Sequence, residues 1–261
     1  MRLGVCAGID RAADIGEAGY DYIELPLSST LCPLEPESAI LETLRKISAL
    51  PIPVESYNIF LPANVKVTGP EADIEIQRRY LASAFRRAAQ TGAEVVVFGS
   101  AGARNLPPGW PRERGERQIS DFLSLSSRYA EKYRVKCALE PLQLAESNII
   151  NTVSEAYRMV QQISSTWVGV LADLYHIECD GEPMSHIEEA ADRLLHVHTA
   201  DTGRLAPGTG DYPNQALIQT LKKIGYDARI SVECQWRDFL EELKLSHRTL
   251  RSYVENPICD G

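Results

Sequence analysis

The sequence predicts an α/β fold in which eight parallel strands alternate with helices and close into a barrel. Short runs of β-branched or apolar residues recur along the chain, and each is followed by a longer stretch with helical periodicity. Runs such as EVVVF and VGVLA are apolar throughout, which is typical of strands covered by helices on both faces. The chain has 261 residues, close to the length of a (β/α)8 TIM barrel.

The eight expected strands are taken in chain order. They cover residues 2–7, 22–25, 54–58, 94–98, 135–140, 168–173, 194–199 and 229–233.

Helices are expected between these strands. Thr152 with Glu155 three residues later predicts a capping box, and Gly92 and Gly225 stand where two helices should end. The expected apolar stripes are Leu81, Ala84, Phe85 and Ala88; Val153, Ala156, Tyr157, Val160 and Ile163; Leu217, Leu221 and Ile224; and Trp236, Leu240, Leu243, Leu250 and Val254. The Gly/Pro-rich segment 99–111 is expected to form a loop at the mouth of the barrel.

The domain organisation is expected to be simple. No linker or low-complexity segment divides the chain, so residues 1–261 are interpreted as one domain. The alternative, a doubly wound open sheet, usually has a glycine-rich phosphate turn after an early strand. The sequence contains neither GxGxxG nor GxxxxGK[ST].

The composition of the chain argues against several classes of function. There are 27 Lys and Arg residues against 36 Asp and Glu residues, a net charge of −9, which disfavours nucleic acid as a partner. No apolar run is long enough to span a membrane, and the N-terminus lacks a secretory signal. The six cysteines include no CxxC pair and are interpreted as free thiols. We therefore expect a cytoplasmic protein.

Four titratable residues stand at the ends of consecutive expected strands, the fifth to the eighth. They are Glu140, Asp173, His198 and Glu233. In a barrel the ends of these strands meet at one half of the mouth. Three carboxylates there would repel one another unless a cation is bound, and three oxygen donors with one imidazole suit Mn²⁺, Mg²⁺ or Co²⁺, with Zn²⁺ also allowed.

The chain resembles the sugar phosphate isomerase/epimerase superfamily of xylose isomerase-like TIM barrels. The resemblance is carried by YDYIELP, VVVFGSAGARNLPPGWPRE, LEPLQLAESN, LADLYH, HVHTADTGRLAPGTGDY and ISVEC. It is strongest to the branch that contains D-tagatose 3-epimerase, D-psicose epimerase and hydroxypyruvate isomerase. It implies one divalent metal bound by Glu140, Asp173, His198 and Glu233.

The resemblance also implies further roles. Glu146, His176 and Arg204 match the family's substrate-binding positions, and Glu140 and Glu233 are the expected acid/base pair. The implied reaction isomerises or epimerises a ketose, a ketose phosphate or a related hydroxy-ketone through an enediolate. The implied partner is a small sugar or sugar phosphate, and the sequence leaves homo-oligomerisation, the metal and the particular sugar open.

Three alternative functions differ in what they require of the sequence. A keto-cyclitol dehydratase of the inosose dehydratase type shares the ligands and the first step, and the sequence does not separate it from an epimerase. An endonuclease IV-like repair enzyme needs three zinc ions and many histidines, whereas this chain has five histidines. A non-catalytic barrel should have lost at least one of the four ligands.

Several nearby polar residues are not assigned a catalytic role. His196 shares a strand face with His198 and is interpreted as buried beside or below the site. For Glu24, a structural hydrogen bond to a neighbouring loop is as good an interpretation as a substrate contact. Ser56 and Asn58 are treated as pocket lining only.

Overall fold

The computed structural model describes residues 1–256, and over this range eight parallel strands form a closed barrel in the order β1 to β8. The barrel closes between β8 and β1, where Leu3 pairs with Ile230. The strands are β1 (Arg2–Cys6), β2 (Tyr22–Pro26), β3 (Val54–Asn58), β4 (Val95–Phe98), β5 (Lys136–Leu139), β6 (Val168–Asp173), β7 (Leu194–Thr199) and β8 (Arg229–Val232). The predicted (β/α)8 fold is confirmed.

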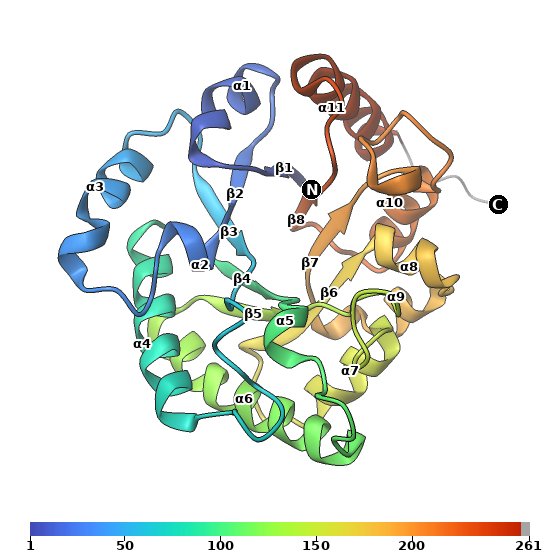
Figure 1. The fold of residues 1–261 in the computed structure, drawn as a ribbon. Helices are drawn as coiled ribbons and strands as arrows, with labels where there is room; N and C mark the ends of the chain where they lie inside the picture. Colours follow the sequence, from blue (N-terminus) through green and yellow to red (C-terminus); the bar gives the residue numbers. More distant parts are fainter. Residues whose placement is uncertain (257–261) are drawn as a thin grey trace.

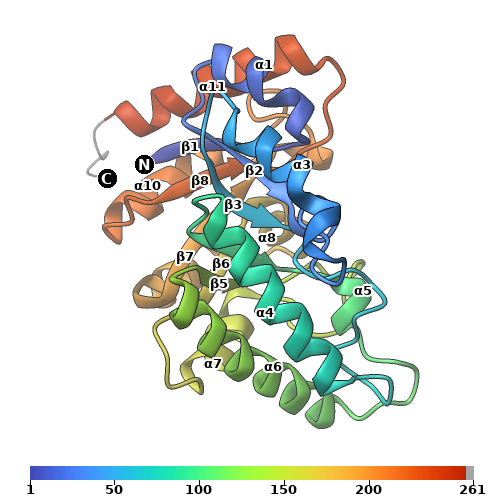
Figure 2. The same cartoon turned by 90° about the vertical axis from the view of Figure 1, so that its left-hand side faces the viewer.

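Helices surround the strands on all sides (Figure 1). They are α1 (Ala12–Glu17), α2 (Leu27–Thr30), α3 (Glu37–Ser48), α4 (Ile74–Gln90), α5 (Ala101–Arg104), α6 (Arg112–Tyr133), α7 (Val153–Gln161), α8 (Leu174–Asp180), α9 (Ser185–Glu189), α10 (Asn214–Lys223) and α11 (Phe239–Glu255). In the side view of Figure 2, the N-terminus lies at one end of the barrel and α5 at the other. None of the helices over residues 1–256 is both long and apolar enough to cross a bilayer.

The main hydrophobic core lies between the strands and the surrounding helices. Within it Phe60 packs against Tyr80, Phe85, Phe98 and Phe122, with ring centroids 5.6–6.3 Å apart. Tilted and edge-on aromatic contacts of this kind add stability beyond the burial of apolar area. The outer core therefore ties α4 and α6 to β4.

A smaller apolar cluster, Val95, Val97, Ala138 and Leu171, packs separately from the main core. Side chains two residues apart on a strand point to the same face. Residues Gly99, Glu140 and Asp173 each follow a member of this cluster by two positions. The cluster thus fills the interior of the barrel on these strands. The carboxylates of Glu140 and Asp173 lie above it, at the carboxyl ends of the strands.

The predicted start of α7 is confirmed, but the expected capping box is formed from one side only. The Thr152 side chain accepts a hydrogen bond from the Glu155 amide at 3.1 Å. In the capping box the glutamate usually reaches back to the capping residue. Here the Glu155 carboxylate instead accepts from the amide of Asn151, one residue earlier, at 2.7 Å. Gly92 and Gly225 follow α4 and α10 with φ of 85° and 72°, as the expected ends required.

Two expectations about local structure were wrong. The segment 99–111 is not purely loop, because Ala101–Arg104 form the short helix α5. Trp236 precedes the last helix rather than lying on its stripe, and Leu240 is 49% exposed. Tyr157 packs against the core from α7 as expected, and its hydroxyl donates to Asp192 at 2.8 Å. Cys6, Cys32, Cys137, Cys179 and Cys234 are free thiols as expected, and Cys259 lies outside the described residues.

Candidate metal and active site

The four candidate ligands predicted from the sequence come together at the mouth of the barrel. Glu140 and Glu233 directly follow β5 and β8, Asp173 ends β6, and His198 lies near the end of β7. One donor atom from each residue lies within 4.8 Å of all the others. Four side chains that are far apart in the sequence thus converge on one small volume.

His198 lies at the centre of this group. Its Nδ1 atom is 3.4 Å from Glu140 Oε1 and 3.4 Å from Glu233 Oε2. Three buried atoms of the group have no hydrogen-bond partner: Glu140 Oε1, Asp173 Oδ2 and His198 Nδ1. Buried polar atoms left without a partner carry a free-energy penalty. Their convergence indicates that the site is built for a species that all of them contact.

Asp173 has two functions at the end of β6. Its Oδ1 atom accepts from the Tyr175 amide at 2.9 Å and so caps the start of α8. Its Oδ2 atom is left to face the site. Burial raises the pKa of Asp173 above its ordinary value, because the charged form loses water. A cation at Oδ2 would relieve that penalty.

Glu233 is held from two sides. Asn58 Nδ2 donates to its Oε1 at 2.8 Å, and Arg204 Nη2 donates to its Oε2 at 2.8 Å. Burial opposes the charge on Glu233, but His198 and Arg204 outweigh it and lower the pKa of Glu233 to about 2. The guanidinium and the imidazole therefore favour the ionised form of the carboxylate. Asn58, expected only to line the pocket, positions this residue directly.

Glu140 is fitted against the backbone of the neighbouring strand. Its amide donates to the Phe98 carbonyl at 3.1 Å. A Cβ atom built on Gly99 would lie 2.0 Å from Glu140 Oε2. A larger residue at this position would force the carboxylate to move, so the residue after β4 helps to set where Glu140 points.

Arg204 links the candidate ligands to the expected substrate-binding residues. Besides Glu233, it contacts Glu146 Oε1 at 3.3 Å, and its guanidinium lies 4.7 Å from the centre of the Tyr175 ring. Gln143 Nε2 donates to both Glu146 Oε1, at 3.0 Å, and the Tyr175 hydroxyl, at 2.9 Å. These contacts hold the guanidinium in one orientation, which suits it to donate to a substrate hydroxyl.

His176 faces the same volume from α8. Its Nδ1 atom accepts from the Gln143 amide at 3.3 Å, and its Nε2 atom lies 3.6 Å from Asp173 Oδ2. A neutral imidazole that accepts at Nδ1 carries its proton at Nε2. His176 therefore presents an N–H group to the site. All seven residues predicted from the sequence lie in one connected group.

Glu24 has a position that the sequence interpretation missed. The expected bond to a neighbouring loop is wrong, because the side chain lies inside the barrel and is fully buried. Its carboxylate contacts His198 Nε2 at 2.9 Å and His196 Nε2 at 2.7 Å. Burial alone would raise the pKa of Glu24, but the two imidazoles outweigh it and hold this pKa well below its ordinary value. His196 is buried below the site, as expected.

The donor set fits a divalent cation. Three carboxylates and one imidazole nitrogen make an oxygen-rich site, which suits Mn²⁺, Mg²⁺ or Co²⁺. Histidine and carboxylate ligands also occur together in catalytic zinc sites. The unpartnered atoms Glu140 Oε1, Asp173 Oδ2 and His198 Nδ1 are the ones that such an ion would need.

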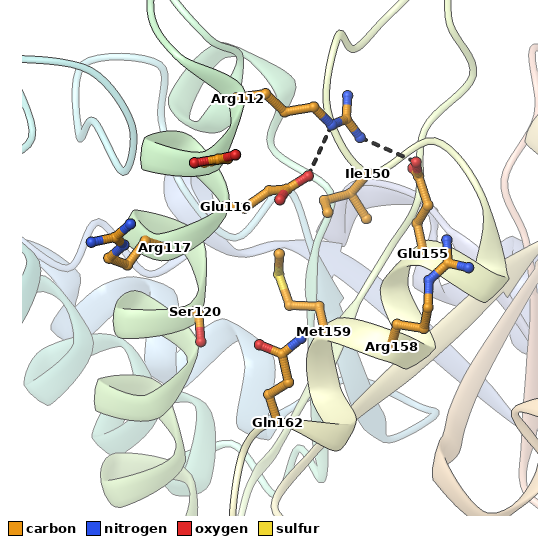
Figure 3. Close-up of a pocket in the computed structure, with 10 residues that line it drawn as sticks. Arg112, Glu116, Arg117, Ser120, Ile150, Glu155, Arg158, Met159 and Gln162 are labelled. Carbon is orange, nitrogen blue, oxygen red and sulfur yellow. Dashed lines mark hydrogen bonds and ion pairs between the residues drawn. The ribbon is translucent and has the colours of Figure 1, made fainter.

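A cavity of about 550 Å³ lies outside the barrel, between α6 and α7 (Figure 3). Arg112 spans it by contacting Glu116 at 2.8 Å and Glu155 at 3.1 Å. The remaining lining residues are Glu113, Arg117, Ser120, Ile150, Arg158, Met159 and Gln162. None of the candidate ligands lines this cavity, so it is separate from the site at the mouth.

The geometry agrees with comparisons to known proteins. The model of the family described as "Xylose isomerase-like TIM barrel" matches residues 9–253. The chain belongs to this family. D-psicose 3-epimerase of Enterocloster bolteae is 34% identical over 123 residues, which are 47% of this chain and 40% of that relative's length. The family resemblance inferred from the sequence is confirmed.

Solved structures share the fold at lower identity. The D-psicose 3-epimerase of Clostridium cellulolyticum H10 with D-tagatose has a TM-score of 0.85 at 18% identity, covering 98% of this chain and 100% of that one. The IolI protein with a bound zinc atom has a TM-score of 0.75 at 20% identity, covering 97% and 98%. At these identities the structures show the fold alone.

Proposed function

We propose that this chain is a divalent-metal-dependent isomerase or epimerase of a small ketose. One observation supports this most directly. Three buried atoms without hydrogen-bond partners lie close together at the mouth of the barrel, namely Glu140 Oε1, Asp173 Oδ2 and His198 Nδ1. The D-psicose 3-epimerase relative supports the same reaction class.

The proposed reaction moves a hydrogen on a carbon next to a carbonyl group. When bound, a divalent ion would stabilise the negative charge that develops on the substrate oxygens as the C–H bond breaks. The ion would be held by Glu140, Asp173, His198 and Glu233. The chain itself supplies the groups that orient the sugar and move the proton.

Glu140 and Glu233 are the proposed acid/base pair. They follow β5 and β8, so they reach the site from strands separated by β6 and β7. Epimerisation requires the proton to leave from one face of the substrate and return to the other. One ionised carboxylate would take the proton, which gives an enediolate, and the other, protonated, would return one to the opposite face.

Arg204, Glu146 and His176 are proposed to bind the sugar. His176 presents an N–H group beside Asp173, and Arg204 presents a guanidinium held by Glu146 and Glu233. These donors suit hydroxyl and carbonyl oxygens next to the reacting carbon. Glu146 is 37% exposed and is available to accept from a sugar hydroxyl.

The charges at the mouth favour an unphosphorylated substrate. Arg204 contacts the site carboxylates, and it already pairs with both Glu146 and Glu233. A phosphate dianion near these carboxylates would be repelled by their negative charge, and the Arg204 guanidinium is already paired. We therefore propose a free ketose in preference to a ketose phosphate.

The decisive experiment measures proton exchange. Metal-stripped protein would be supplied with Mn²⁺, Mg²⁺, Co²⁺ or Zn²⁺ and incubated in D2O with a panel of free ketoses, ketose phosphates, hydroxypyruvate and keto-inositols. We expect a free ketose to give a product that carries deuterium at the inverted carbon, and only when metal is present. Glu140→Gln and Glu233→Gln should each slow turnover by roughly 10²–10⁴-fold.

Glu178→Gln is the matched control, because this half-buried glutamate lies on α8 outside the group. It should leave turnover unchanged. Retention of the original hydrogen, together with full activity of one glutamine variant, would rule out the two-base mechanism. A product that lacks the elements of water would assign the site to a dehydratase instead, and failure of every metal and substrate would reject the proposed function.

A further inference from the structure

One buried carboxylate lies directly beneath the candidate metal site. Glu24 Oε1 is 2.9 Å from His198 Nε2, and Glu24 Oε2 is 2.7 Å from His196 Nε2. All three side chains are fully buried. A single carboxylate on β2 thus contacts two histidines on β7 across the interior of the barrel.

Hydroxyl groups donate hydrogen bonds to only one of the two Glu24 carboxylate oxygens. Ser56 Oγ donates to Glu24 Oε2 at 2.7 Å, and Ser231 Oγ donates to the same atom at 2.6 Å. The Tyr22 hydroxyl lies 2.7 Å from Ser231 Oγ, and because Ser231 donates to Glu24, Tyr22 donates to Ser231. Glu24 Oε1 has His198 as its hydrogen-bond partner among the described residues.

The pattern of donors dictates where the His198 proton lies. An ionised carboxylate only accepts hydrogen bonds, so the ring nitrogen that faces it must donate. A neutral His198 therefore carries its proton on Nε2 and leaves Nδ1 as an acceptor. Nδ1 is the atom that lies 3.4 Å from Glu140 Oε1 and from Glu233 Oε2.

We propose that Glu24 is a positioning residue, which fixes His198 as its Nε2–H tautomer and aims the unprotonated Nδ1 atom into the group of carboxylates. A metal ion binds the nitrogen that has no proton, and the hydrogen bond made by the other nitrogen sets which one that is. The inference rests on the proposed function for the metal, and the position of the proton is read in the metal-bound protein. In the metal-free chain burial opposes the charge on His198, but Glu24 and Glu233 outweigh it and raise the pKa of His198.

The test uses Glu24→Gln in the full-length protein. Glutamine has nearly the same size as glutamate. Its amide nitrogen donates, however, so the side chain can no longer accept hydrogen bonds from both histidines. Two-bond ¹⁵N–¹H correlation spectra of the protein loaded with Zn²⁺, which is diamagnetic, report which nitrogen of each histidine carries the proton, with His196→Gln used to separate the two sets of signals. Calorimetric titration with Mn²⁺ gives the metal affinity.

We expect the parent protein to show His198 as the Nε2–H form. Glu24→Gln should populate the Nδ1–H form and lower Mn²⁺ affinity by about 10–100-fold, the usual range for partners of a metal-binding histidine. Ser56→Ala is the matched control, since it removes a donor from Glu24 Oε2 but leaves Oε1 and His198 in contact. It should keep both the tautomer and the affinity of the parent.

Two outcomes would overturn the inference. One is an Nδ1–H form of His198 in the parent protein, a result that needs no variant and stands even if Glu24→Gln does not fold. The other is an equal loss of Mn²⁺ affinity in Ser56→Ala and Glu24→Gln, which would make Glu24 a general core residue. A parent protein that binds no divalent ion would reject the proposed function and this inference with it, whereas metal binding with the Nδ1–H form of His198 would reject the inference alone.

Discussion

The two halves of the barrel contribute differently to the site. Strands β5 to β8 carry the four candidate ligands Glu140, Asp173, His198 and Glu233. Strands β2 to β4 carry none of them. They provide the residues that hold the ligands in place, namely Glu24, which contacts His198, Asn58, which contacts Glu233, and Gly99, which leaves room for Glu140.

The difference shows how a closed barrel can separate binding from positioning. Because β1 pairs with β8, residues on β2 and β3 face those on β7 and β8 across a narrow interior. A side chain on one wall can therefore fix the rotamer or protonation of a side chain on the other. Changes in the two halves should then have separable effects, and the following predictions test this.

The largest effect is expected from Asp173→Asn in the ligand half. The asparagine carbonyl can still accept from the Tyr175 amide and cap α8, so the fold should persist. The charge at Oδ2 is lost, and metal affinity should fall by more than the roughly 100-fold that partners of ligands contribute, with turnover falling alongside. Metal content after purification without chelator and Mn²⁺ titration measure this.

Asp180→Asn, at the other end of α8, is the control for this change. Asp180 accepts from the Leu144 amide at 2.8 Å and lies outside the group of ligands. It should keep full metal content. An Asp173→Asn protein that also kept full metal content would show that the ligand assignment is wrong.

An intermediate effect is expected from Gly99→Ala in the supporting half. The new methyl group would lie 2.0 Å from Glu140 Oε2, so the carboxylate must move. We expect metal affinity to fall by about 10–100-fold, as for other groups that orient a ligand. Thermal unfolding measured with and without Mn²⁺ would show a smaller metal-induced shift than in the parent protein.

Gly102→Ala separates this effect from general crowding. Its methyl group would lie 2.8 Å from the Ala63 side chain, in the same loop region but away from Glu140. It should lower stability while leaving metal affinity unchanged. Equal losses of metal affinity in both variants would show that the loop, rather than Gly99 itself, sets the position of Glu140.

The same contrast explains what the sequence could predict. The ligands were found because each polar residue ends an apolar strand, a pattern visible locally at Asp173 and Glu233. Glu24 lies in the middle of β2, and its partner His198 is 174 residues away. Pairing across the barrel depends on how the strands close, so the local pattern could not distinguish this residue from a loop contact.

Local irregularities were also beyond the sequence pattern. The eight strands were predicted because each is a short apolar run between helical stripes, and their observed bounds differ from the prediction by at most one residue at either end. The helix α5 lies in a Gly/Pro-rich segment that favours turns. At its start Ser100 adopts a left-handed conformation, with φ of 41°, and the Ser100 hydroxyl accepts from the Leu61 amide at 3.0 Å. That contact comes from the neighbouring β3 loop.

The smallest effect is expected on the outer surface of the supporting half, at Glu37. Hydrogen bonds from Arg86 and Arg87 lower the pKa of this carboxyl to about 2. A lowered folded-state pKa gives stability that is present above the unfolded value of about 4.3 and is lost as pH falls toward 2. Glu37 is 53% exposed, so solvent screening should limit the contribution to about 1 kcal/mol or less. Urea unfolding of Glu37→Gln should therefore show a small deficit at pH 7 that closes in acid, with Mn²⁺ affinity unchanged at pH 7. A change in that affinity would mean that the supporting half acts on the site through its outer helices as well as through its strands.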